Sequence, residues 1–180
     1  GVATVVGFPC GYNCLRQKVQ ETVELVAAGA TEIDMVVTLA HLLEGRFDLL
    51  EEEIAQVVIA AQQAPVKVII ECCYLDRAQK IAATQAAVAA GAAFVKTSTG
   101  FGPSGATLED VQLLVDAAAG QIAVKAAGGI RSWQACEKFL AAGAERIGTS
   151  SGVAILQQWQ LAGRRFCCRT NHTRVQYNSQ

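Results

Sequence analysis

The feature that most constrains the fold is a repeated alternation of short apolar runs and amphipathic segments. The apolar runs begin at intervals of about 30 residues, and in the segments between them apolar residues recur at helical spacing, as at Val19, Val23 and Val26. The runs are apolar without alternation, which is typical of parallel strands covered on both faces. The sequence therefore predicts strands at 2–6, 32–37, 66–71, 94–96, 122–125 and 146–148.

Helices are predicted between these strands. Ala-Gly-Ala recurs at 28–30, 90–92 and 142–144, where the glycine suits the position just after a helix. Thr107 and Ser132 are expected to be N-caps. The expected helices cover 16–28, 39–43, 47–63, 76–90, 107–119, 132–142 and 150–159.

Such a series of β/α units indicates either a TIM (β/α)₈ barrel or a doubly wound sheet. No Gly-x-Gly-x-x-Gly follows an early strand, which disfavours a dinucleotide-binding fold. A full barrel has eight units and about 250 residues, so we predict a TIM-type α/β barrel with about six of the eight β/α units present in this 180-residue chain and the first two missing. The open seam would expose two strand edges, which favours a homo-oligomer.

Composition narrows the class of protein. Hydrophobic residues make up 52% of the chain, no apolar run approaches the ~20 residues of a membrane span, and no signal peptide is visible. The net charge of −1 indicates neither a nucleic-acid nor a membrane partner. We predict one domain over residues 1–156 and a divergent, flexible basic tail over 157–180, which is either a solvated extension or a segment that binds an anionic partner.

The cysteines and histidines do not predict a disulfide framework or a metal site. Two of the cysteine pairs are adjacent in sequence, at 72–73 and 167–168, and Cys10 and Cys14 have no matching pair for a zinc ribbon. The two histidines belong to no ligand cluster. We expect reduced thiols in a cytoplasmic protein.

Amine chemistry is indicated by Lys96, which ends an apolar run and precedes a loop of small hydroxyl residues and glycines. A lysine in water has a pKa of ~10.4, so a reactive lysine must lose roughly three units, about 4 kcal/mol, through burial or a nearby cation. Lys125 ends the next apolar run in the same way and would face the same end of the barrel. The alternative is two ordinary lysines that reach solvent.

Asp34 is the carboxylate expected beside these amines. It lies within an apolar strand, where an unpaired carboxylate is costly. A lysine partner would remove that cost, and the pair would serve either as a proton relay or as a structural ion pair. Glu71 is another acidic residue at a strand end.

Two glycine-rich turns predict an anion site. Gly128 and Gly129 follow the fifth strand, and Gly148, Ser150 and Ser151 lie in the turn that leads from the sixth strand into a helix. Bare backbone N–H groups and helix N-termini bind phosphate, and the last two loops of a barrel are its usual phosphate position. Glycines required only for turn geometry are the alternative.

The same turn, Gly-Thr-Ser-Ser-Gly, matches the nucleophile elbow of serine hydrolases. That fold requires an acid and then a histidine after the serine. His172 follows Ser150, but no Asp or Glu does, so the sequence excludes this mechanism.

Together these stretches resemble the deoxyribose-phosphate aldolase family. The resemblance covers residues 1–156, in order and with compatible spacing. The matching stretches are VATVVGFP (2–9), EIDMV (32–36), IIECCYL (69–75), FVKTSTGF (94–101), VKAAGGIR (124–131) and GTSSG (148–152).

The resemblance implies a class I aldolase, independent of metals and cofactors, that reversibly cleaves 2-deoxy-D-ribose 5-phosphate to D-glyceraldehyde 3-phosphate and acetaldehyde in deoxyribonucleotide catabolism. Lys96 matches the Schiff-base lysine of the family, Lys125 the second lysine that favours the free amine on the first, and Asp34 the proton-relay carboxylate. The phosphate-binding turns are matched by Gly128, Gly129, Gly148, Ser150 and Ser151.

Two other functions stay open at this stage. One is an inactive, incomplete barrel that only binds phosphosugars or does not fold alone. The other is a phosphosugar isomerase on the same barrel, which would use a carboxylate base and form no Schiff base.

Overall fold

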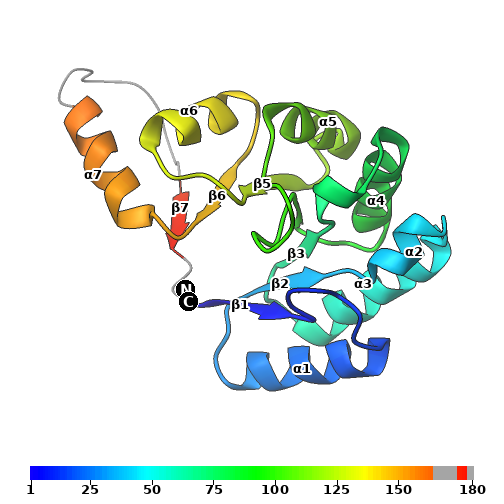
Figure 1. Ribbon diagram of the computed structural model, residues 1–180. Coiled ribbons are helices and arrows are strands. Elements are labelled where there is room, and N and C mark those ends of the chain that lie inside the picture. The colour runs from blue at the N-terminus through cyan, green and yellow to red at the C-terminus, as the bar shows by residue number, and fades with distance from the viewer. Residues whose placement is uncertain (164–173, 178–180) are drawn as a thin grey trace.

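A curled sheet of parallel strands forms the centre of the molecule. The computed structural model describes residues 1–163 and 174–177 (Figure 1). The strands pair in sequence order, and each pair is parallel. They are β1 (Ala3–Val6), β2 (Glu32–Val36), β3 (Val66–Ile69), β4 (Phe94–Lys96), β5 (Ala123–Ala127), β6 (Arg146–Thr149) and β7 (Arg174–Tyr177).

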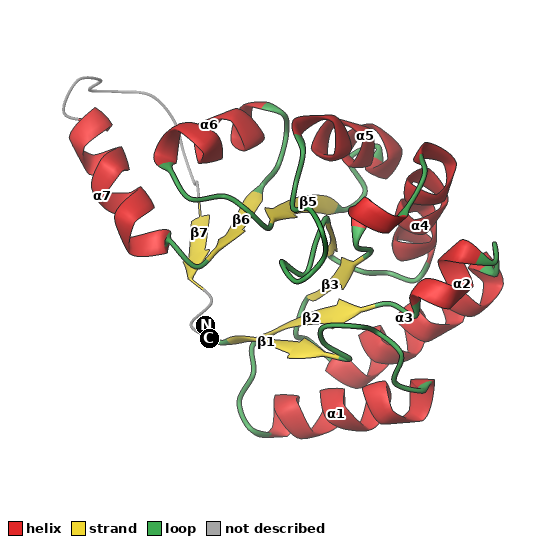
Figure 2. Cartoon of the chain, viewed as in Figure 1, coloured by secondary structure: helices red, strands yellow, loops and turns green. Residues whose placement is uncertain are grey.

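Helices cover the outer side of this sheet (Figure 2). Successive long helices contact one another, so they form an outer layer that follows the curve of the strands. The helices are α1 (Leu15–Ala27), α2 (Leu39–Leu43), α3 (Phe47–Ala61), α4 (Arg77–Ala89), α5 (Leu108–Ala118), α6 (Trp133–Ala141) and α7 (Gly152–Gly163), with a 3₁₀ turn η1 at Cys72–Tyr74. The predicted α/β barrel with six β/α units is confirmed.

Capping residues explain where the helices begin and end. Thr107 and Ser132 accept hydrogen bonds from backbone N–H groups three residues on, as predicted, and Asp76 does the same for α4. Each Ala-Gly-Ala turn places its glycine at positive φ after a helix, for example Gly29 at +100°. The helix boundaries lie within two residues of the predicted ones, except that α7 ends at Gly163 where residue 159 was predicted.

The C-terminal part differs from the prediction. β7 pairs with β6, whereas no strand was predicted after residue 149. Its four residues are too short a run to stand out in a polar sequence. The predicted domain boundary at 156 falls within α7, and residues 164–173 and 178–180 of the predicted flexible tail lie outside the described residues.

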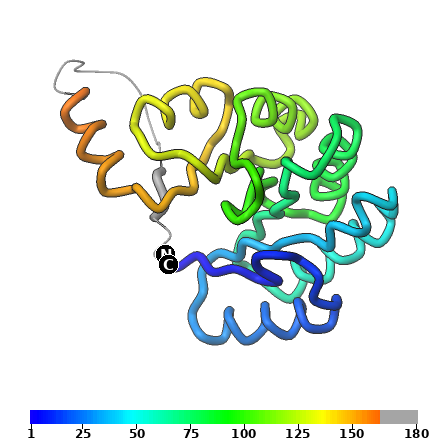
Figure 3. The backbone as a smooth tube through the Cα atoms, viewed as in Figure 1, coloured from blue at the N-terminus to red at the C-terminus, as the bar shows by residue number. Residues whose placement is uncertain are grey.

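The sheet is open within the described residues. β1 and β7 are its two end strands, and no pairing joins them. Figure 3 follows the open arc of the backbone from the N-terminus, in blue, to α7, in orange. The expected seam with two strand edges is therefore present in the described part of the barrel.

The two faces of the sheet are chemically opposite. Apolar side chains such as Ile33, Val95 and Ile147 point outward and are fully buried against the helices. Charged side chains face inward from β2 to β6, and those of Asp34, Lys67, Lys96, Lys125 and Arg146 are buried. The core thus lies between sheet and helices, whereas the inner face carries ionisable groups.

A separate buried ion pair joins α1 to α3, beside the loops that follow β1 and β2. The Lys18 Nζ lies 2.5 Å from the Glu53 Oε1 and donates to the Thr38 hydroxyl. Glu53 also accepts from the Thr38 backbone N–H, and the Thr38 hydroxyl donates to the Gly11 carbonyl. Burial lowers the pKa of Lys18, while Glu53 opposes that shift.

In the described part of the chain no helix is long and apolar enough to span a bilayer. The cysteines at 10, 14, 72, 73 and 136 are free thiols. Those at 167 and 168 lie outside the described residues.

We predict that Lys18→Met lowers the free energy of unfolding by about 3 kcal/mol, because it leaves the Glu53 carboxylate buried without its cation. Urea unfolding measures this change. The double variant Lys18→Met/Glu53→Leu should recover much of the loss, since it removes the orphaned charge as well. A single variant as stable as the wild-type protein would show that the pair does not stabilise the packing of α1 against α3.

Candidate active site

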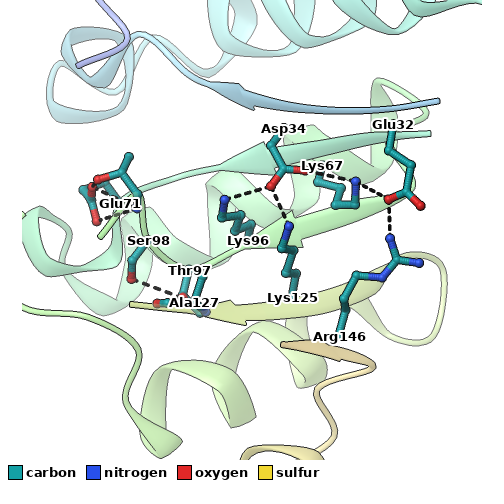
Figure 4. Close-up of polar contacts among 11 residues, drawn as sticks. Glu32, Asp34, Lys67, Glu71, Lys96, Thr97, Ser98, Lys125, Ala127 and Arg146 are labelled. Carbon is teal, nitrogen blue, oxygen red and sulfur yellow. Dashed lines mark hydrogen bonds and ion pairs between the residues drawn. The ribbon is translucent and has the colours of Figure 1, made fainter. Parts of the chain in front are cut away.

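Asp34 is the centre of a buried ionic cluster inside the barrel (Figure 4). Its Oδ2 accepts hydrogen bonds from the Lys96 Nζ at 2.8 Å and from the Lys125 Nζ at 2.7 Å. All three residues are almost fully buried. The structure therefore brings the three residues expected to carry the chemistry onto one oxygen atom, from strands β2, β4 and β5.

The cluster continues toward the N-terminal ends of the strands. The Lys67 Nζ lies 2.9 Å from the Asp34 Oδ1 and 2.6 Å from the Glu32 Oε2. Glu32 in turn pairs with Arg146, whose guanidinium lies 4.7 Å from the centre of the Phe94 ring. Glu32, Phe94 and Arg146 come from β2, β4 and β6, so alternate strands fill one layer of the interior, as in complete TIM barrels.

Positive charge is in excess in this cluster. Two carboxylates, Glu32 and Asp34, face four cations: Lys67, Lys96, Lys125 and Arg146. With every group ionised the cluster carries a net charge of +2.

Burial and the charges of this cluster shift the pKa values of Asp34 and Lys125. Burial alone would raise the pKa of Asp34, but the three ammonium groups outweigh it and hold that pKa well below its usual range. Burial lowers the pKa of Lys125 to about 8; Asp34 opposes the shift and the Lys96 ammonium adds to it. A lysine whose pKa lies near neutral pH can release and accept protons during a reaction.

Gly148 leaves room for the Lys125 side chain. A Cβ at this position would lie 3.2 Å from the Lys125 Cε and 3.0 Å from the Ala127 Cβ. Both contacts are tighter than side chains normally make. The glycine therefore has a packing role in the interior, besides its place in the predicted anion turn.

An open cleft of about 330 Å³ lies at the C-terminal ends of the strands. Of the Asp34, Lys96 and Lys125 cluster, only Lys96 lines it. Asp34 and Lys125 are buried and reach the cleft through Lys96. A molecule in the cleft would meet one amine, backed by a carboxylate and a second amine.

The predicted anion turns border the same cleft. Its lining includes Gly128, Gly129, Gly148 and Ser150, whereas Ser151 is not among the lining residues. The backbone N–H of Ser151 donates to the Thr149 hydroxyl, which binds the Ile130 carbonyl. Ser151 thus belongs to the turn that leads into α7.

Close backbone contact fixes the first of these turns. Gly128 has a φ of +92°, and a Cβ there would lie 2.9 Å from the Gly105 Cα. The Ala106 N–H donates to the carbonyl of Ala127 at 3.1 Å. The loop after β4 therefore rests directly on the turn after β5, and a side chain at residue 128 would push them apart.

Glu71 holds the other end of that loop. Its carboxylate accepts from the Thr99 backbone N–H and from the Thr99 hydroxyl. Thr99 and Phe101 line the cleft, and the Phe101 ring packs edge-on against Phe8 at 5.4 Å. The acidic strand end seen in the sequence therefore positions the loop at the rim of the cleft.

Sequence reasoning missed several residues of this site. Lys67 interrupts an apolar strand just as Asp34 does, so the same cost argument could have identified it. Glu32 and Arg146 stand at strand starts, where charged residues are common and carry no signal. Arg131 lines the cleft, and the sequence indicates no role for it beyond its place in the VKAAGGIR stretch.

No group of three or more His, Cys, Asp or Glu side chains in residues 1–163 and 174–177 is arranged to hold a metal ion. His172, the histidine that follows Ser150 in the sequence, lies outside the described residues.

A parallel α/β barrel that presents a buried lysine to a cleft at its strand ends defines an enzyme of the TIM-barrel class. Comparison with known proteins gives the family. The DeoC/LacD family aldolase model matches residues 1–158, and the chain belongs to this family of aldolases.

Individual relatives agree with this assignment. A deoxyribose-phosphate aldolase of Syntrophotalea carbinolica is 53% identical over 161 residues, which are 89% of this chain and 73% of the relative. The solved structure of the aldolase QR15 superposes with a TM-score of 0.87 at 42% identity, over 91% of this chain and 74% of that chain.

A third similar protein is the deoxyribose phosphate aldolase of Aeropyrum pernix, described as having a unique tetrameric structure. It superposes with a TM-score of 0.82 at 35% identity, over 88% of this chain and 67% of that chain. This chain therefore corresponds to roughly two thirds to three quarters of the length of these relatives.

The lowered pKa of Lys125 predicts a specific pH dependence of stability. Between about pH 8 and about pH 10.4 the unfolded chain holds a proton on Lys125 that the folded protein has released. The free energy of unfolding should therefore gain a term that rises with pH in this window, by up to about 1.4 kcal/mol per pH unit.

Urea unfolding of the wild-type protein and of Lys125→Met from pH 7 to 10 measures this term. Asp34 keeps Lys67 and Lys96 as partners in the variant, and all other titrating groups are common to both proteins. The difference between the two curves should show the rise. Parallel curves would contradict a lowered pKa at Lys125.

Proposed function

We propose that this chain catalyses the reversible cleavage of 2-deoxy-D-ribose 5-phosphate to D-glyceraldehyde 3-phosphate and acetaldehyde through a Schiff base on Lys96. The observation that carries the proposal is the Lys96 amine, which lines the cleft while it donates to a carboxylate oxygen shared with a second lysine. The named activity of relatives about 50% identical supports the same substrate.

The first step is imine formation. The neutral amine of Lys96 attacks the C1 aldehyde of the open-chain sugar, and water leaves. Once formed, the protonated imine withdraws electrons from the C2–C3 bond.

The second step breaks that bond. The C3 hydroxyl loses its proton and the C2–C3 bond breaks. The electron pair of that bond moves into the imine and forms an enamine on Lys96, while glyceraldehyde 3-phosphate leaves. Protonation of the enamine at C2 and hydrolysis of the imine release acetaldehyde and restore the amine. Asp34 and Lys125 would move these protons through a water molecule, because they lie directly behind Lys96.

The phosphate would bind at the turns after β5 and β6. Their glycines, Gly128, Gly129 and Gly148, offer backbone N–H groups at the cleft, Ser150 adds a hydroxyl donor, and Ser151 completes the turn before α7. In the proposed pose the phosphate lies at the opposite end of the sugar from the aldehyde that Lys96 attacks. Binding energy at the phosphate would then orient the reacting bond.

The proposal predicts that Lys96→Arg removes the activity and leaves the fold intact. An arginine keeps the charge beside Asp34 but cannot form the imine, so kcat should fall on the order of 10³-fold or more. Release of acetaldehyde from 2-deoxy-D-ribose 5-phosphate measures the rate, and urea unfolding checks the fold.

The matched control is Lys80→Arg, which alters an ion-paired lysine between α4 and α5, 2.6 Å from Asp110. This variant should keep the wild-type rate. A Lys96→Arg enzyme that still cleaves the sugar would refute the Schiff base on Lys96. A stable wild-type protein without activity would favour a barrel that only binds phosphosugars.

We also propose that the chain self-associates. In residues 1–163 and 174–177 the outer edges of β1 and β7 have no partner strand, which supports this proposal, since strand edges favour pairing between chains. Sedimentation velocity over a hundredfold range of concentration tests it. An oligomer that forms with rising concentration is expected, and a monomer at the highest concentration would contradict it.

A further inference from the structure

Lys67 is a fully buried lysine for which the proposed chemistry has no role. It lies on β3 in register with Asp34 of β2. Burying an ammonium group costs several kcal/mol unless it is well paired. It is not among the residues that line the cleft with Lys96, so any function it has must act through a neighbour.

The neighbour is the Asp34 carboxylate, which is held on both of its oxygens. Oδ2 accepts from Lys96 and Lys125, and Oδ1 faces the Lys67 Nζ at 2.9 Å. The Lys67 contact lies off the hydrogen-bonding direction, so the attraction there is Coulombic. The terminal torsion of an aspartate is broad, and a charge beside one oxygen therefore helps to fix the plane of the group.

Lys67 is itself anchored on the far side. Its Nζ lies 2.6 Å from the Glu32 Oε2, and Glu32 is paired with Arg146. Arg146 stacks on Phe94 at 4.7 Å. The position of the Lys67 ammonium is thus fixed by groups from β2, β4 and β6 that take no part in the cleft.

We propose that Lys67 is a positioning residue, which holds the Asp34 carboxylate so that one oxygen faces both Lys96 and Lys125. The expected effect of Lys67 on the reaction rate rests on the proposed function. The orientation of Asp34 is a structural property and is tested separately.

The test variant is Lys67→Met, which keeps the length of the side chain and removes its charge. Both carboxylates retain cations, Glu32 through Arg146 and Asp34 through Lys96 and Lys125, so no buried anion is orphaned. In kinetics with 2-deoxy-D-ribose 5-phosphate, kcat should fall ten- to a hundredfold while KM changes less than about twofold, because a misplaced relay slows the chemistry without weakening phosphate binding.

Two further variants complete the test. Lys67→Gln retains a polar N–H group for Oδ1 and should recover part of the lost kcat; it also replaces Lys67→Met if the latter does not fold. Lys80→Met removes a lysine that pairs with Asp110 in the helical layer, and it should leave kcat unchanged.

Crystal structures of the wild-type and variant proteins give a readout that needs no activity. A carboxylate of Asp34 that has rotated away from Lys96 or Lys125 in Lys67→Met supports the proposal. An unmoved carboxylate overturns it, as does an unchanged kcat or a rise in KM that matches the loss in kcat. A wild-type protein that cleaves no sugar would refute the proposed function, and the position of Asp34 would still decide the role of Lys67.

Discussion

The polar interior of this barrel depends on one buried carboxylate. Asp34 is the shared anion for three ammonium groups, those of Lys67, Lys96 and Lys125. Without it those cations would repel one another in a space from which water is largely excluded, at a cost of several kcal/mol. The amines of Lys96 and Lys125 can therefore lie close together only because the Asp34 carboxylate lies between them.

The barrel architecture places that carboxylate where chemistry can use it. Parallel strands bring their C-terminal ends to one side, and alternation along each strand sends apolar residues to the helices and charged ones inward. A glycine at residue 148 leaves space for Lys125, and Lys96 alone of the three central residues reaches the cleft. Burial and accessibility are thus divided between two lysines on adjacent strands.

Much of this could be predicted from the sequence, because its signals are local. Apolar runs, capping residues and Ala-Gly-Ala turns gave the six β/α units, and the cost of a carboxylate in an apolar strand identified Asp34. The layer formed by Glu32, Phe94 and Arg146, toward the N-terminal ends of the strands, could not be predicted in the same way. The Glu32–Arg146 pair joins β2 to β6 across the barrel interior, and only the curvature of the sheet brings such distant residues together. The short strand β7 carried too few residues to give a pattern.

The most direct test of the account is borohydride trapping with acetaldehyde, followed by peptide mass mapping. Reduction converts an imine to a stable secondary amine and records which lysine formed it. The account predicts a single adduct, on Lys96, even though Lys125 and Lys67 lie in the same cluster. The absence of an adduct, or labelling spread over surface lysines, would contradict the claim that the buried cluster activates this one amine.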